Sequence, residues 1–179
     1  HRDLHYPLRR QRQMCIRDRV SFPAWVFGGT GEENLETAIG AVKEVLRRAE
    51  EIGCTVALYN HGDWFGEPEN QVRIIETIGS DHLKMVYNFH HGHNHMDRFG
   101  ELFPLMLPHL SAVNINGMSS GGPKIITLGD GEKELQMLRV MRTSGYDGPL
   151  GIIGHTEGED IRVVLERNLK GLEKLKQSL

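Results

Sequence analysis

Short apolar runs alternate with helix-like segments along most of the chain. From residue 20 onward, an apolar run is followed by a polar or Gly-rich loop and then by a segment whose apolar positions recur every three or four residues. This order occurs five times, and the apolar runs predict strands at residues 20–27, 55–59, 83–87, 110–115 and 149–153. Five strands alternating with five helices imply parallel pairs joined by right-handed crossovers, and therefore an α/β barrel or a doubly wound sheet.

The helices are predicted from apolar positions that share one face. The first helix ends near Ile52, before Gly53, the second begins at Pro68, and the third covers about residues 97–107. The predicted apolar faces are Leu35, Ile39, Val42, Leu46 and Ala49 in the first helix, Val72, Ile75 and Ile78 in the second, Leu135, Leu138 and Met141 in the fourth, and Ile161, Leu165, Leu169, Leu172 and Leu175 in the fifth.

The first 19 residues differ from the rest of the chain in composition and in hydrophobic pattern. They hold six Arg and two Asp without apolar periodicity, and the stretch MCIRDR matches a translated sequencing-transposon end. We interpret residues 1–19 as a non-native segment and residues 20–179 as one domain. The alternative is a basic N-terminal arm that binds nucleic acid or a membrane.

Charge and composition narrow the class of protein. Without residues 1–19, the 21 basic and 24 acidic residues become 15 and 22, a formal charge of −7, and no basic stripe is left for nucleic acid. No apolar run is long enough for a membrane span, and we expect a cytoplasmic location. Cys54 is then the one remaining cysteine, so we expect a buried thiol rather than a disulfide or a thiolate metal cluster.

Polar clusters follow four of the five predicted strands, as YNHGD, NFHHGHNH, NINGM and GHTEGE. Because the C-terminal ends of parallel strands meet at one edge, side chains there are candidates for a shared site. The candidates are Asn60, His61, Asp63, Asn88, His90, His91, His93, His95, Asn114, Asn116 and His155. The simpler alternative is that these Asn and His side chains only satisfy the backbone of turns.

Imidazole can transfer protons near pH 7 and can bind metal ions, so the histidines carry the strongest chemical signal. Trp64 could stack on a sugar, although an aromatic residue covering the rim of a barrel is equally expected. Lys124 could attract an anionic substrate, although a solvated loop lysine explains it as well.

A family resemblance rests on the segments VALYNHGDWFGEPEN, MVYNFHHGH, VNINGM, ITLGDGE and GYDGPLGIIGH. Together they resemble the second half of the xylose isomerase-like TIM barrels, the sugar phosphate isomerases and epimerases. The resemblance implies a partial (β/α)8 TIM barrel with about five of the eight βα units and with the N-terminal strands missing. An open barrel would have an unpaired strand edge, so a homo-oligomer is possible.

The family typically holds a divalent ion with Glu, Asp, His and Glu at successive strand ends. At the corresponding places this chain has Tyr59, Asn88, Asn114 and Gly154. The loss of three carboxylates disfavours a hard ion such as magnesium.

Two arrangements of the site remain open. A zinc-like ion could be held by His61, by His91 or His93, and by His155. Alternatively, a metal-free pocket could bind a carbohydrate through neutral hydrogen bonds from Asn60, Asn88, Asn114 and Asn116.

The resemblance implies a sugar or polyol isomerase or epimerase acting on a small carbohydrate. Its proton-transfer residues would be His61 and His91, which match the histidines of the family's Glu-Asn-His and Asp-x-x-His runs. Asn60, Trp64, Asn88, His93, Asn114, Asn116 and Lys124 would bind the substrate. The alternatives are a non-catalytic carbohydrate-binding relative and, less favoured by the acidic charge and missing carboxylates, an endonuclease of the abasic-site type.

Overall fold

The computed structural model describes residues 19–22, 32–154, 156 and 158–179. The chain divides into two compact units, His1–Met85 and Val86–Leu179, and each is considered by itself. Residues 1–18, and with them nearly all of the expected non-native segment, lie outside the described residues, as do residues 23–27 of the first predicted strand.

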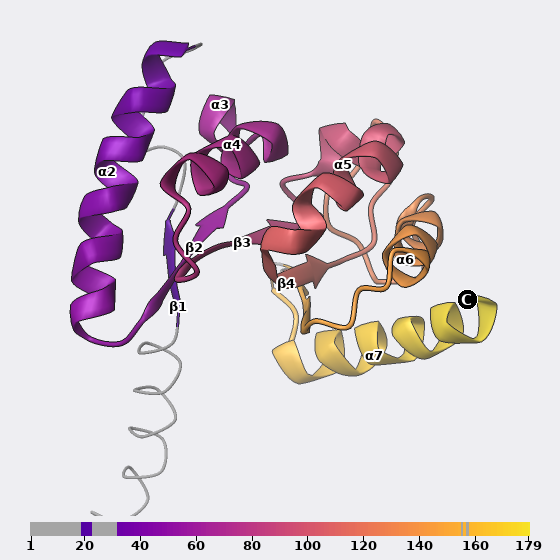
Figure 1. Ribbon diagram of the computed structural model, residues 1–179. Coiled ribbons are helices and arrows are strands. Elements are labelled where there is room, and N and C mark those ends of the chain that lie inside the picture. Colours follow the sequence, from indigo (N-terminus) through magenta and orange to yellow (C-terminus); the bar gives the residue numbers. More distant parts are fainter. Residues whose placement is uncertain (1–18, 23–31, 155, 157) are drawn as a thin grey trace, which may run out of the picture. The chain divides into compact units, whose positions relative to one another are not determined.

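The first unit contains two paired strands and the helices that follow them (Figure 1). β1 pairs with β2 in parallel, with Val20 opposite Val56, and the backbone N–H of Val56 donates to the carbonyl of His82 just before β3. The elements are β1 (Arg19–Phe22), α2 (Glu32–Glu51), β2 (Thr55–Tyr59), α3 (Asp63–Gly66), α4 (Pro68–Ile78) and the beginning of β3 (Leu83–Asn88).

α2 has the amphipathic pattern that its sequence predicts. Val42, Leu46 and Ala49 of the predicted face are buried together with Ala38, whereas Leu35 and Ile39 are half-buried. α2 contacts both β2 and α4. The helix ends before Gly53, whose φ of 69° is a left-handed conformation that glycine adopts without strain. The predicted helix and its end are therefore confirmed.

α4 begins with Pro68 at its first turn, as predicted, but its buried face differs from the predicted one. Gln71, Ile74 and Ile75 are buried, whereas Val72 is only half-buried. The face is displaced because α4 packs against both α2 and α3. The short helix α3 was not predicted.

The second unit begins within β3 and has the strand order β3-β4-β5. β4 pairs with β5 in parallel, with Asn114 opposite Gly151. The elements after β3 are the 3-10 helix η2 (His93–Arg98), α5 (Phe99–Met106), the 3-10 turn η3 (Leu107–His109), β4 (Leu110–Ile115), α6 (Glu134–Thr143), β5 (Leu150–Ile152) and α7 (Ile161–Ser178). In the described part of the chain, no helix combines the length and the apolar character that a membrane crossing requires.

An aromatic cluster fills the core between β3 and α5. Tyr87, Phe89, Phe99 and Phe103 are all at most 1% exposed, and ring centroids are 5.5 Å apart for Phe89 and Phe99 and 5.1 Å apart for Phe99 and Phe103. A Cβ at Gly92 would overlap the hydroxyl of Tyr87, so the loop after β3 can lie on this ring only with a glycine there. The predicted helix 97–107 is divided, because its first residues belong to η2.

The predicted apolar face of α7 is wrong for Ile161, Leu165 and Leu169, whereas Leu175 is buried as predicted and Leu172 is half-buried. Val164, Asn168 and Leu175 are buried, whereas Ile161 is 71%, Leu165 47% and Leu169 45% exposed. The inward direction of the helix is set by Gly171, which lies against the carbonyl oxygen of Leu128, where a Cβ would overlap that oxygen. α7 therefore turns Gly171, and not the stripe of Ile161, Leu165 and Leu169, toward the rest of the second unit.

Gly171→Ala should destabilise the second unit. The added methyl meets the Leu128 backbone, which cannot move away as a flexible side chain would, so we expect a cost of about 1–3 kcal/mol or more in the free energy of unfolding. Urea denaturation followed by circular dichroism measures this change.

The matched control is Gly100→Ala in α5. The nearest atom to a Cβ at Gly100 is the Cγ2 of Val140 at 4.0 Å, so alanine should be tolerated or should stabilise by up to about 1 kcal/mol. Equal effects of the two substitutions would contradict the close approach of α7 to Leu128.

Candidate functional site

The loop after β2 holds His61 in a tight turn. The backbone N–H of His61 donates to the carbonyl of Tyr59 at 2.8 Å, and the two rings stack with centroids 6.4 Å apart. A Cβ at Gly66 would lie 2.8 Å from the carbonyl carbon of His61, so a glycine there lets α3 fold back onto the turn. The turn leaves His61 half-buried, while Asn60 before it is 1% exposed.

The two residues that open α3 have different roles. Asp63 is exposed and has a φ of 49°, a left-handed conformation that is uncommon for residues other than glycine, although Asp tolerates it better than most. Trp64 is half-buried, and its carbonyl accepts a hydrogen bond of 2.7 Å from the Nδ2 of Asn70. The amide of Asn70 thus joins α3 to α4.

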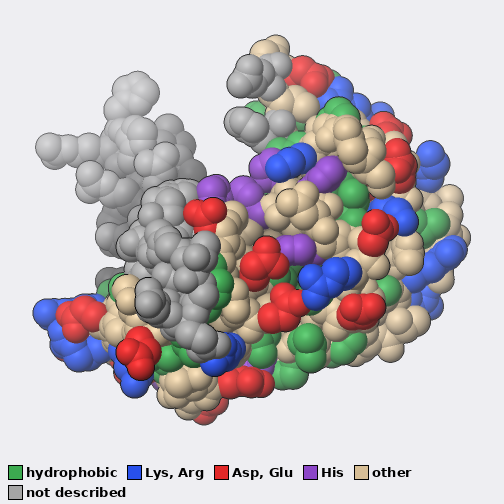
Figure 2. Space-filling model, turned by 90° about the horizontal axis from the view of Figure 1, so that it is seen from above, with side chains coloured by type: hydrophobic (Ala, Val, Ile, Leu, Met, Phe, Trp, Pro, Cys, Tyr) green, Lys and Arg blue, Asp and Glu red, His purple; other side chains and the backbone are tan. Residues whose placement is uncertain are grey.

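The loop after β3 turns on Asn88. Its buried Oδ1 accepts the backbone N–H of His90 at 3.0 Å, and its carbonyl accepts the N–H of Gly92 at 2.9 Å. This turn brings the rings of His90 and His91 to a centroid distance of 4.5 Å, with both half-buried. Figure 2 shows histidine side chains that reach the surface of the molecule, as these partly exposed rings do.

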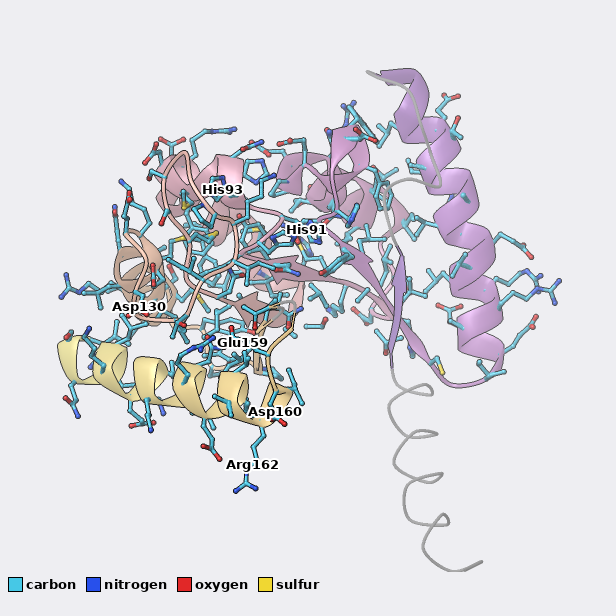
Figure 3. All side chains as sticks on the ribbon, turned by 180° about the vertical axis from the view of Figure 1, so that it is seen from behind. His91, His93, Asp130, Glu159, Asp160 and Arg162 are labelled. Atoms are coloured by element: carbon cyan, nitrogen blue, oxygen red, sulfur yellow. The ribbon has the colours of Figure 1, made fainter. Side chains whose placement is uncertain are left out.

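His93 connects two loops of the second unit. Its Nε2 lies 2.8 Å from the carbonyl oxygen of Ser119 in the loop after β4, so Nε2 carries the hydrogen in this contact. His91 and His93 both belong to the loop after β3 (Figure 3), but this contact is made by His93. His95 is 8% exposed.

The amide side chains at the end of β4 lie in different surroundings. A Cβ at Gly151 would overlap the Oδ1 of Asn114, so Asn114 lies across β5 and needs the glycine beside it. Asn116 is fully buried, and its Nδ2 donates to the carbonyls of Gly117 at 2.9 Å and Lys124 at 2.8 Å. The Asn116 amide therefore holds the loop of which Lys124, itself exposed, forms part.

Sequence reasoning missed the two side chains that hold the LGDGE segment. Glu134 is 1% exposed, and its Oε1 accepts the N–H groups of Gly129 at 3.0 Å and Gly131 at 2.7 Å. Asn168 in α7 is 2% exposed, and its Oδ1 accepts the N–H of Leu128 at 2.9 Å. A carboxylate three residues after a Gly-x-Gly turn, at a helix start, is the signal that could have identified Glu134.

Gly151 and Gly154 face different neighbours. A Cβ at Gly154 would point at α7, 2.7 Å from the Cγ1 of Val164, whereas a Cβ at Gly151 points at Asn114. Because side chains alternate along an extended strand, Ile153 shares the face of Gly151 and Asn114, and Gly154 does not. That Gly154 occupies the place of the last family Glu stays a prediction, and Ile153 beside it has no donor atom in its side chain.

The loop after β5 is attached to α7 by an ion pair. Arg167 contacts both carboxylate oxygens of Glu159, at 2.7 and 3.0 Å. The hydrogen bonds from Arg167, followed by its positive charge, hold the pKa of Glu159 below its ordinary value. The hydrogen bond to Glu159 raises the pKa of Arg167, and the negative charge of Asp130 also raises it. Arg167 thus interacts with Asp130 in the loop after β4 and with Glu159 in the loop after β5.

The predicted convergence of three histidines stays a prediction. His61 belongs to the first unit and His91 to the second, while His155 lies outside the described residues. Within the described ranges, no three His, Cys, Asp or Glu side chains are grouped so as to hold a metal ion.

The donors present do not fit a hard divalent cation at the family's ligand positions. Asn88 and Asn114 offer neutral amide oxygens, and the Oδ1 of Asn88 already accepts the N–H of His90. Tyr59 lies beside His61, and Ile153 offers nothing. Without a carboxylate, these four positions cannot offset the charge of magnesium or manganese.

The chain belongs to the xylose isomerase-like TIM barrel family, whose sequence profile matches residues 10–175. This agrees with the resemblance found in the sequence and with the order of parallel strands and helices in each unit. The match begins within residues 1–19, and the expected domain boundary after residue 19 stays a prediction. No curated protein matches the sequence.

Several solved structures share this fold. An L-ribulose 3-epimerase aligns with a TM-score of 0.71 and 15% identity over 94% of this chain and 67% of its own. A D-psicose 3-epimerase from Clostridium cellulolyticum H10, solved with D-tagatose, has a TM-score of 0.65, 12% identity and coverages of 89% and 64%. A xylose isomerase-like TIM barrel protein from Mycobacterium smegmatis, solved with magnesium, has a TM-score of 0.59 and 20% identity, and the alignment covers 85% of this chain and 54% of that protein. The chain thus spans between about half and two thirds of these proteins, and the likeness is one of fold.

Replacing Glu134 should loosen the LGDGE segment. In Glu134→Ala the N–H groups of Gly129 and Gly131 lose their acceptor while remaining inside the loop, a cost of about 1–3 kcal/mol. We expect faster amide hydrogen exchange at both glycines, measured by NMR.

Glu132→Ala is the control, because Glu132 is exposed and its side chain accepts a hydrogen bond of 3.3 Å from the N–H of Ser120. Glu132→Ala should change the free energy of unfolding by no more than about 0.5 kcal/mol. Unchanged exchange at Gly129 and Gly131 in Glu134→Ala would show that the carboxylate does not hold the loop.

Proposed function

We propose that the protein acts on a small carbohydrate as an isomerase or epimerase, at the C-terminal ends of its strands. The observation that carries this proposal is membership of the xylose isomerase-like TIM barrel family over residues 10–175. The L-ribulose and D-psicose 3-epimerases among the structures with this fold support the substrate class. In TIM barrels the C-terminal strand ends form the active-site face.

His61 and His91 are the proposed proton-transfer residues. His61 lies two residues after β2 and His91 three residues after β3, both are half-buried, and each belongs to a tight turn. Isomerisation and epimerisation beside a carbonyl require one group to remove a proton from carbon and a group to return it. Imidazole suits both tasks because its pKa lies near the working pH. No step is assigned to a metal ion, because the donors at the family positions do not fit one.

The remaining strand-end residues are the proposed substrate-binding groups. Asn114 carries an amide at the end of β4, and Trp64 presents a half-buried indole at α3 that could stack on a sugar ring. Asn60, Asn88, His93, Asn116 and Lys124 complete the proposed set. The first four are buried or tied into loops, so they would act mainly by shaping the pocket.

A non-catalytic carbohydrate-binding protein is the second candidate. The observation that favours it is the neutral character of the family ligand positions, where Tyr59, Asn88, Asn114 and Ile153 or Gly154 replace charged groups. Amide groups bind sugar hydroxyls by hydrogen bonds without transferring protons. The two candidates differ in whether a carbon-bound hydrogen of the sugar exchanges with solvent.

The test is hydrogen exchange into ketopentoses and ketohexoses in D2O. An isomerase or epimerase replaces a hydrogen on the carbon beside the carbonyl with deuterium, which NMR and mass spectrometry detect. His91→Ala and His61→Ala should each slow this exchange by about a hundred- to ten-thousand-fold.

His82→Ala provides the matched control, since His82 is exposed and lies before β3, at the opposite end of the strand from the proposed site. Its exchange rate should equal that of the unaltered protein. Sugar binding without exchange would favour the binding protein, and neither binding nor exchange for any sugar would contradict a carbohydrate function.

A zinc site is the alternative to proton transfer by His61 and His91: any tightly held metal ion should be a nitrogen-preferring one such as zinc, with His61, His91 and His155 as the proposed ligands. Magnesium and manganese should bind weakly because carboxylates are absent. Zinc affinity should fall as pH drops through about 6.5, because protonation removes the lone pair of an imidazole ligand.

Metal analysis of the purified protein and of His61→Ala and His155→Ala tests this proposal. Stoichiometric zinc that is lost in both variants would support it, with His82→Ala again as the control. Tight magnesium, or zinc retained in both variants, would contradict it.

A further inference from the structure

We propose that His93 is a positioning residue, one that fixes the turn carrying His91 for proton transfer, and this role rests on the function proposed above. The Nε2 of His93 lies 2.8 Å from the carbonyl oxygen of Ser119, in the loop after β4. His91 lies two residues earlier in the same loop after β3 (Figure 3). The imidazole of His93 thus joins the turn that carries His91 to a neighbouring loop of the same unit.

The turn that carries His91 is attached to β3 by backbone contacts. The Oδ1 of Asn88 accepts the N–H of His90 at 3.0 Å, and the carbonyl of Asn88 accepts the N–H of Gly92 at 2.9 Å. Gly92 also lies against the buried ring of Tyr87, because a Cβ at this position would overlap the Tyr87 hydroxyl. These contacts fix the turn relative to β3, and the imidazole of His93 attaches it on the side of β4.

The carbonyl of Ser119 belongs to a loop that is closed by its own backbone. This carbonyl also accepts the N–H of Gly122 at 3.0 Å, and the N–H of Ser119 donates to the carbonyl of Pro123 at 3.1 Å. At the base of the loop, Gly117 and Ile126 exchange two hydrogen bonds of 3.2 and 2.9 Å. Since a carbonyl oxygen has two lone pairs, it accommodates both N–H donors, and His93 is held by an acceptor that is itself held in place.

The hydrogen bond to Ser119 also determines the tautomer of His93. A carbonyl oxygen only accepts hydrogen bonds, so Nε2 carries the hydrogen and, in the neutral ring, Nδ1 carries the lone pair. The contact therefore has a spectroscopic signature that can be measured without any substrate.

The position of His91 matters because proton transfer from carbon depends steeply on geometry. In that step the carbon–hydrogen bond breaks, its electron pair forms the carbon–carbon double bond of an enediolate, and the proton moves to a ring nitrogen of His91. The reacting atoms have to lie about 3–3.5 Å apart, and a displacement of about 1 Å slows such a reaction by about a hundredfold. Loss of the His93 contact should therefore reduce the rate of the reaction more than the binding of the sugar.

NMR tests the contact independently of any activity. The ring of His93 should show the Nε2–H tautomer, and His93→Ala should speed amide hydrogen exchange at His90 and Gly92 several-fold. His93→Gln should restore slow exchange, because the side-chain N–H of glutamine can reach the same carbonyl. An Nδ1–H tautomer, or unchanged exchange in His93→Ala, would overturn the proposal.

The kinetics of deuterium incorporation into the sugar test the role in proton transfer. His93→Ala should lower kcat by up to about a hundredfold with little change in KM, and His93→Gln should recover most of the loss. An unchanged kcat, or a loss that glutamine does not recover, would overturn the positioning role. Absence of incorporation by the unaltered protein would contradict the proposed function, whereas the NMR result would still decide whether His93 holds the turn.

Asp97→Ala is the matched control on the same 3-10 helix. The Oδ1 of Asp97 lies 3.0 Å from the Nζ of Lys133, but the Asp97 side chain is 85% exposed, and exposed ion pairs contribute little. This variant should therefore leave both kcat and the amide exchange of Gly92 unchanged. Equal effects of Asp97→Ala and His93→Ala would show that any loosening of η2 disturbs the turn, and would overturn the specific role of the contact with Ser119.

Discussion

The connection between β4 and α6 has to satisfy its backbone hydrogen bonds inside the second unit, and much of that unit follows from this requirement. Leu128 donates its N–H to Asn168, while Gly129 and Gly131 donate theirs to Glu134. The carbonyl of Leu128 lies against Gly171, where no side chain fits. α7 must therefore present Asn168 and Gly171 inward, and its leucine stripe faces outward as a consequence.

Side chains at the strand ends also form hydrogen bonds with the loop backbone. Asn88 and Asn116 carry the residue types of a binding site, yet their amides hold turns, and the Nε2 of His93 holds the loop after β4. His91 and Asn114 are both half-buried. A polar residue at the mouth of a parallel strand can thus build the site without contacting its ligand.

Membership of the xylose isomerase-like TIM barrel family gives the frame in which this site is interpreted. The family fold supplies the strand ends, but the neutral side chains at its ligand positions remove the charge that a hard cation requires. Function therefore cannot follow from the fold alone and depends on the residues that occupy the site. Proton transfer by imidazole is the chemistry that the remaining residues support best.

The sequence by itself determined the order of strands and helices, because apolar periodicity and glycine or proline at element ends are local signals. β2 and β4 have the predicted bounds, and α2 has the predicted end and buries Val42, Leu46 and Ala49 of its predicted face. Tertiary structure alone decided which side of α7 is buried, since two apolar arcs compete on that helix and the selection of Gly171 depends on Leu128, more than forty residues away along the chain. The role of Asn168 was equally inaccessible, because its hydrogen bond to the backbone of Leu128, 40 residues away, leaves no periodic pattern in the sequence.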